Sequence, residues 1–103
     1  MDYKVVIAPR AIDDLRDIVL YITPDRPEAA RRFGLALIER TKVLGDFPLS
    51  GKIVPEFKEQ VIRELILTPY RIVYRIDEVA KVVGVARYWH GARGALDAED
   101  LKE

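Results

Sequence analysis

The spacing of hydrophobic residues changes near the middle of the chain. Between residues 12 and 44 they recur at intervals of three and four, which predicts amphipathic helices. After residue 61 they alternate with polar residues, as in "YRIVYRID" at 70–77, and a period of two is typical of β-strands. The pattern therefore predicts a helical first half and a strand-rich second half.

Two helices are predicted in the first half, after a short strand at "DYKVVIA". Pro9 suits the first turn of a helix because its missing N–H is not needed there, and the apolar stripe continues to Ile22. The sequence "TPDRPE" ends this helix and begins a second one, which we expect Asp25 to cap together with Glu28. The second helix continues to about Gly45. So short a connection predicts an antiparallel hairpin.

Three strands are predicted in the second half, after a loop, "DFPLSGKIVPEFKEQ", that has two prolines and no sustained period. The strands are "VIRELIL", "YRIVYRI" and "KVVGVARYW". Their short connections predict antiparallel pairing, because a parallel return needs a crossover of about a dozen residues. Residues 91–103 are predicted to form a tail that is either flexible or a short helical turn.

The predicted fold is a single α+β domain over residues 1–103. An N-terminal strand precedes a two-helix antiparallel hairpin, and the hairpin packs on one face of a small, four-stranded antiparallel β-sheet in which the first strand lies beside a later one. The predicted core consists of apolar residues on the inward stripes of these elements: Ile12, Leu15, Ile18, Ile22, Phe33, Leu37, Ile72 and Val85.

Composition excludes several classes of protein. The chain has 103 residues and no cysteine, so disulfides, zinc ribbons and thiol catalysis are excluded. The amino terminus has an acidic residue at position 2 and does not resemble a signal peptide, and the longest apolar runs, of five residues, are too short for a membrane span. We therefore expect a soluble, cytoplasmic protein. No phosphate-binding, dinucleotide-binding or metal-binding motif is present, so we expect neither a metal ion nor a cofactor.

The charges are unevenly distributed although their sum is zero. Residues 61–93 contain six basic and three acidic residues. The arginines of this segment are Arg63, Arg71, Arg75, Arg87 and Arg93. Arginine is almost never fully buried without a partner. Pairing with Glu64, Asp77 or Glu78 is one interpretation, but the count leaves arginines over. We therefore expect at least two of them to bind a carboxylate or phosphate of another molecule.

His90 is the only histidine and lies in "RYWHGAR", where the last strand is expected to end. Histidine is suited to general acid or base catalysis near neutral pH, and Tyr88, Arg87 and Arg93 could position a phosphate beside it. The alternative is a turn residue whose ring is hydrogen-bonded to the backbone. The sequence leaves both interpretations open.

Six segments in series resemble the RelE/ParE superfamily of toxins from bacterial type II toxin–antitoxin systems. They are "APRAIDDLRDIVLYI", "RPEAARRFGLALIER", "FPLSGKIVPEF", "VIREL", "PYRIVYRI" and "RYWHGAR", and together they cover nearly the whole chain. The resemblance implies a helical hairpin on a small antiparallel sheet and a cognate antitoxin whose flexible segment wraps the toxin. It also offers two activities, because the RelE-like branch cuts messenger RNA on the ribosome and the ParE-like branch poisons DNA gyrase.

The long helical hairpin and the "HGAR" ending are more similar to the ParE side. The resemblance therefore implies a toxin that poisons DNA gyrase and is neutralised by a ParD-like antitoxin. The alternative is a RelE-like, metal-independent endoribonuclease. Its best catalytic set would be Glu64 as base and His90 as acid, with Tyr88 as a substitute for either and Arg87 to stabilise charge.

Two binding surfaces follow from the resemblance and the charge distribution. Arg71 and Arg75 are expected to bind an acidic, disordered antitoxin segment as it folds. Leu20 and Leu35 lie off the main core stripes of the helices and are expected to add apolar contacts to the antitoxin. Gyrase is expected to contact the basic and aromatic segment near the end of the chain: Arg87, Trp89, His90 and Arg93.

Overall fold

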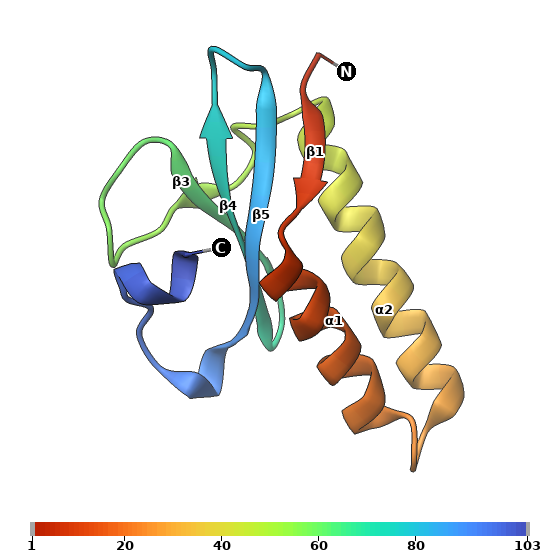
Figure 1. Ribbon diagram of the computed structural model, residues 1–103. Helices are drawn as coiled ribbons and strands as arrows, with labels where there is room; N and C mark the ends of the chain where they lie inside the picture. The colour runs from red at the N-terminus through yellow and green to blue at the C-terminus, as the bar shows by residue number, and fades with distance from the viewer. Residues whose placement is uncertain (1, 103) are drawn as a thin grey trace.

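The first half of the chain forms the predicted helical hairpin. The computed structural model describes residues 2–102. Helices α1 (Pro9–Ile22) and α2 (Pro27–Lys42) both begin with proline and lie antiparallel beside the sheet (Figure 1). Asp25 does not cap α2, contrary to the prediction, because Pro27 makes Arg26 the N-cap residue and no side chain caps it. No helix among residues 2–102 is both long and apolar enough to cross a membrane.

The sheet has five strands in the order β1-β5-β4-β3-β2. They are β1 (Lys4–Ile7), β2 (Lys52–Ile53), β3 (Ile62–Leu67), β4 (Tyr70–Asp77) and β5 (Val82–His90). The predicted fold class and the place of the first strand beside a later one are confirmed. Two details were wrong. Lys52 and Ile53 form a fifth strand against β3, and β1 runs parallel to β5 because the helices return the chain to the end of the sheet where it started.

A bulge in β5 determines which of its side chains face the helices. Ala86 has no partner on β4, and the register of the two strands shifts at this point. Val85 and Tyr88 therefore both pack in the core beneath the helices, although three positions apart they would lie on opposite faces of a regular strand. Arg87 and Trp89 consequently lie on the face of the sheet that is turned away from the helices.

The main core lies between the helices and the sheet. Seven of the eight predicted core residues belong to it: Ile18, Leu37, Ile72 and Val85 are buried, and Leu15, Ile22 and Phe33 pack against them. Ile12 was predicted wrongly, since 48% of it is exposed. The inward stripe of α1 begins instead at Ala11, which is fully buried and precedes Leu15 and Ile18 at helical spacing.

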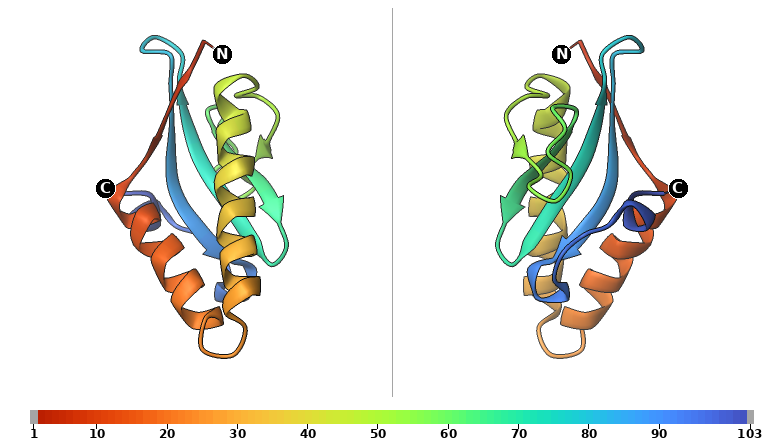
Figure 2. Two further views of the ribbon diagram at one scale, coloured as in Figure 1. Left: turned by 90° about the vertical axis from the view of Figure 1, so that its right-hand side faces the viewer. Right: turned by 90° about the vertical axis from the view of Figure 1, so that its left-hand side faces the viewer.

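The opposite face of the sheet is covered at one end by the loop after β2 and by the C-terminal tail, which lie toward the viewer in the right-hand view of Figure 2. The tail forms two short 3-10 helices, η2 (Gly91–Arg93) and η3 (Ala98–Leu101), and Leu96 between them is buried. A smaller apolar cluster fills this side: Val54, Ile62, Val73, Trp89 and Leu96. The sheet is therefore packed on both faces, but only part of the second face is covered.

Gly51 lies immediately before β2, where the chain passes very close to the sheet. Its N–H donates to the Tyr74 hydroxyl at 3.0 Å, and that hydroxyl donates to the Pro48 carbonyl at 2.8 Å. A Cβ atom at position 51 would lie 2.5 Å from the Tyr74 hydroxyl and 2.6 Å from the Glu64 carbonyl oxygen. The close approach therefore requires glycine.

We expect Gly51→Ala to lower the free energy of unfolding by about 1–3 kcal/mol, because the added methyl group must displace the backbone of β3. Urea unfolding followed by circular dichroism measures the change. Gly84→Ala is the matched control, since a Cβ atom there meets nothing within 4 Å. Equal stability of the two variants would contradict the close approach at Gly51.

Candidate functional site

Arg71 on β4 is held between two carboxylates. Its Nε donates to Glu64, and its terminal nitrogens donate to both oxygens of Glu56 at 2.8 and 2.7 Å. Glu56 also accepts the N–H of Leu96 from the tail at 3.0 Å. Because the Arg71 side chain is only 16% exposed, these charges interact with little competition from water. One guanidinium thus connects β3, β4, the loop after β2 and the tail.

The bidentate pair shifts the pKa of both partners. Hydrogen bonds from Arg71 lower the pKa of Glu56 to about 2, although partial burial acts in the opposite direction. The same hydrogen bonds from the guanidinium to Glu56 raise the pKa of Arg71 above its ordinary value. Both groups are therefore charged throughout the physiological pH range.

Arg87 on β5 is paired in the same way with Asp14 of α1. Its Nε and one terminal nitrogen donate to the two Asp14 oxygens at 2.7 and 2.9 Å, and its other terminal nitrogen donates to the Asp100 carbonyl at 3.3 Å. The N–H of Tyr88 also donates to Asp14, at 3.0 Å. The hydrogen bonds to Asp14 raise the pKa of Arg87. This ion pair joins the sheet to the first helix.

Neither Arg71 nor Arg87 is free to bind an anion from another molecule in this structure. Sequence reasoning named Glu64 as a possible partner but missed Glu56, Asp14 and Asp100, because these lie outside residues 61–93, the segment over which charges were counted. The charge count that helped to assign Arg71 to the antitoxin and Arg87 to gyrase is therefore answered within the chain.

Two members of the ribonuclease set are enclosed by these ion pairs. The Glu64 side chain is 2% exposed and accepts from Arg71, so it cannot approach a substrate hydroxyl as the structure stands. The Arg87 side chain is 6% exposed and already carries the Asp14 carboxylate. A general base must reach the proton that it removes, and a cation that stabilises a phosphate must face it.

The other two members lie elsewhere. Tyr88 faces the helices, where its hydroxyl is 2.8 Å from the Thr41 hydroxyl, and burial raises its pKa. The Nδ1 atom of His90 accepts the N–H of Ala92 at 2.9 Å, which is a ring-to-backbone bond of the kind expected for a turn residue. No cluster of three or more potential metal ligands occurs in the described part of the chain.

His90 and Arg93 remain accessible at the end of β5. With Tyr21 and Tyr70 they line a surface depression of about 280 Å³, and the rings of Tyr70 and His90 are in edge-to-face contact at 4.9 Å. Trp89 is buried beneath, with the Arg93 guanidinium 4.0 Å from the centre of its ring. Of the four residues predicted to contact gyrase, only the partly buried His90 and the exposed Arg93 are thus accessible to a partner.

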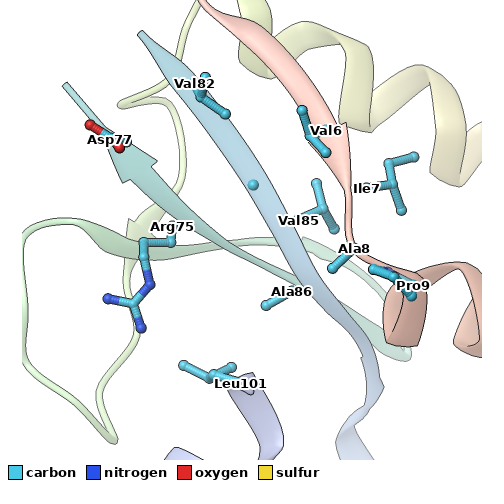
Figure 3. A pocket seen from close by; sticks show the side chains of 11 residues that line it. Val6, Ile7, Ala8, Pro9, Arg75, Asp77, Val82, Val85, Ala86 and Leu101 are labelled. Atoms are coloured by element: carbon cyan, nitrogen blue, oxygen red, sulfur yellow. The ribbon is translucent and has the colours of Figure 1, made fainter. Parts of the chain in front are cut away.

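Arg75 is exposed, and among residues 2–102 no carboxylate pairs with it. It lies at the border of a depression on the uncovered part of the second face, which Figure 3 shows between β1, β4 and β5. Leu20 and Leu35 are 59% and 50% exposed on the two helices. Three of the four residues predicted to bind antitoxin are therefore accessible, although they do not form one cavity.

Comparisons with known proteins give one family and one fold. A family model described as "ParE toxin of type II toxin-antitoxin system, parDE" matches residues 5–94. The chain is similar to a solved chromosomal ParDE system from P. aeruginosa, with a TM-score of 0.72 and 21% identity over 86% of this chain and 96% of that chain. No curated sequence gives a significant match.

Two further solved structures are similar. The toxin–antitoxin complex RelBE2 from Mycobacterium tuberculosis has a TM-score of 0.65 and 26% identity over 87% of this chain and 99% of that chain. A mutant of the E. coli toxin RelE in complex with a peptide of the antitoxin RelBc has a TM-score of 0.59 and 18% identity, over 96% of this chain and 90% of that chain. The fold is therefore found in proteins of both the ParE and the RelE type.

The bonds of Glu56 generate a pH-dependent stability. Its pKa in the folded protein, about 2, is below its ordinary value of 4.5, so its contribution is fully present above pH 4.5 and is lost as the pH falls toward 2. We expect Glu56→Gln to lower the free energy of unfolding by about 2–3 kcal/mol at pH 7 and by less at pH 2. Urea unfolding at a series of pH values measures this. The control is Glu59→Gln, at an exposed position; an equal loss in both variants would argue against the role of Glu56.

Proposed function

The chain belongs to the ParE toxin family of type II toxin–antitoxin systems, since the family model matches residues 5–94, and on this premise we propose that it poisons DNA gyrase and is neutralised by a ParD-like antitoxin. This family membership confirms the resemblance seen in the sequence. The choice of gyrase over messenger RNA rests on one observation, which is that the candidate ribonuclease side chains do not converge on an accessible site.

Cleavage of RNA without a metal ion needs a base, an acid and a cation around the same phosphate. Glu64 is enclosed by Arg71, and Tyr88 points to the opposite face of the sheet. Only His90 is accessible, and one of its ring nitrogens is already bonded to the backbone. Exposing the Glu64 carboxylate would require breaking its pair with Arg71. A gyrase poison needs no such set, because a surface that binds the enzyme and holds its cleaved DNA complex is sufficient.

We place the gyrase-binding surface at the depression around His90 and Arg93. Aromatic residues and arginine are the residue types that contribute most to protein–protein affinity, and Tyr21 and Tyr70 add two exposed or partly exposed rings here. The ring contact with Tyr70 and the hydrogen bond from Ala92 fix His90 before any partner arrives. Such preorganisation reduces the entropy lost on binding. Trp89 supports this surface from beneath and does not contact the target.

Neutralisation is assigned to an antitoxin that contacts Leu20, Leu35 and Arg75. Exposed leucines on adjacent helices are suited to the apolar face of a partner, and an unpaired guanidinium is suited to its carboxylates. Arg71, which we expected to share this task, is already paired with Glu56 and Glu64, so Arg75 is the arginine on which this part of the proposal rests. Both the antitoxin and gyrase would be met in the cytoplasm.

We expect the purified toxin to convert supercoiled plasmid into linear, gyrase-linked DNA in the presence of gyrase and ATP. The double variant His90→Ala, Arg93→Ala is expected to need at least about tenfold more toxin for the same cleavage, because it removes both exposed anchors. Arg31→Ala, on an exposed position of α2, is the matched control. Thermal unfolding of each variant shows whether the fold is intact.

Expression without antitoxin separates the two activities in cells. DNA damage and filamentation with intact messages are expected for a gyrase poison. Cleavage of ribosome-bound messages that disappears in His90→Ala or Glu64→Gln would reject the gyrase proposal. Gyrase-linked breaks that persist in Glu64→Gln and in Tyr88→Phe would reject the ribonuclease alternative.

A further inference from the structure

The uncovered part of the second sheet face forms an open apolar trough. Its volume is about 220 Å³, and it is lined by Val6, Val82, Gly84, Ala86 and Leu101, with Arg75 at its border (Figure 3). The trough is open above Gly84, since a Cβ atom built there meets nothing within 4 Å, and 43% of Val6 is exposed. The described part of the chain therefore leaves this apolar surface to water.

The positive charge of Arg75 at the trough has no paired carboxylate among the described residues, unlike the charges of the other two arginines on this face. Arg71 and Arg87 each have a carboxylate from another segment of the chain. Arg75 has none among residues 2–102, although it projects from the same face of β4 as Arg71. Asp77 also lines the trough, but one of its oxygens already accepts the N–H groups of Val79 and Ala80 at 3.1 and 3.0 Å.

The covered part of the face shows what complements an arginine on this strand. Val54 is fully buried against the sheet, and Glu56, two residues later, forms the bidentate pair with Arg71. An aliphatic side chain and a carboxylate two positions apart therefore satisfy both the apolar surface and the guanidinium. Arg75 lies four residues beyond Arg71 on the same face of β4, and together with the trough it presents the same combination without a cover.

We propose that an extended segment of the antitoxin covers this trough, with an aliphatic side chain above Gly84 and, two residues later, an aspartate or glutamate on Arg75. The inference rests on the proposed function, which supplies the antitoxin. Such a segment reproduces in the partner what Val54 and Glu56 do within the chain. It continues the small apolar cluster of the covered half, because Leu101 of the tail borders both. The charge of Arg75 favours an acidic segment, and the absence of a side chain at Gly84 lets the segment approach the sheet closely.

The proposal is tested by isothermal titration calorimetry, which measures the affinity of the purified cognate antitoxin for the toxin and its variants. Arg75→Ala is expected to weaken binding at least about thirtyfold, as for loss of one partner of a buried charge pair. Gly84→Val is expected to weaken it at least about tenfold while the toxin remains folded, because valine fits a strand and its side chain fills the trough. Lys52→Ala, at an exposed position on β2 at the other edge of the sheet, is the control and is expected to bind within about twofold of the parent protein.

The partner residue is then found by charge exchange. Arg75→Glu is expected to abolish binding, and replacing one acidic residue of the antitoxin by arginine is expected to restore it. Parent-like affinity of both Arg75→Ala and Gly84→Val would overturn this proposal and the assignment of Arg75 to the antitoxin, but would leave gyrase poisoning and neutralisation by an antitoxin standing. Failure of the antitoxin to bind the parent protein would overturn the proposed function and this inference together. Self-association that Arg75→Ala abolishes would assign the trough to a second copy of the chain instead.

Discussion

The pairing of Arg71 with Glu56 and Glu64 is the constraint on which the second face of the sheet depends. A guanidinium that leaves water must find carboxylates, and in a domain of 103 residues these come from wherever the chain can deliver them. The pair with Glu56 holds the loop after β2 against the sheet, and the hydrogen bond from the N–H of Leu96 to Glu56 holds the tail against that loop. Trp89 becomes buried as a result, with Arg93 on its ring. Much of what is accessible near the end of β5 is thus determined by one ion pair on the neighbouring strand.

The same constraint separates the candidate catalytic side chains from one another. The segment of 27 residues from Glu64 to His90 contains arginines, carboxylates, tyrosines and a histidine, a composition that favours phosphate chemistry. In the structure Glu64 is paired with Arg71, and Arg87 is paired with Asp14 of α1. The bulge at Ala86 places Tyr88 on the opposite face of the sheet from Arg87. Residue types alone therefore overstate the catalytic potential, because catalysis depends on which groups face the same space.

Most of the fold could be predicted from the sequence because it depends on local periodicity. Pro9 and Ile22 mark the exact ends of α1, and the three long strands begin within one residue of the predicted positions. The missed features depend on contacts between distant residues. Asp14 looks like a solvent-facing helix residue until Arg87, 73 positions later, is placed against it, and no period signals the bulge at Ala86. The exposed position of Ile12 follows from a shift of one residue in the helix stripe, which a pattern of mixed apolar residues cannot resolve.

The parallel pairing of β1 with β5 has a consequence for the order in which the protein can form during synthesis. The helical hairpin and the meander from β3 to β5 contain mostly local contacts, so each can form as soon as it emerges. Lys4 pairs opposite Val82, and Asp14 meets Arg87, so the sheet cannot close until the last strand has left the ribosome. Closing so long a loop carries an entropic cost that only the completed ion pairs and core offset. A nascent chain therefore lacks the surface around His90 and Arg93 until its synthesis is nearly finished, and a truncated product never acquires it.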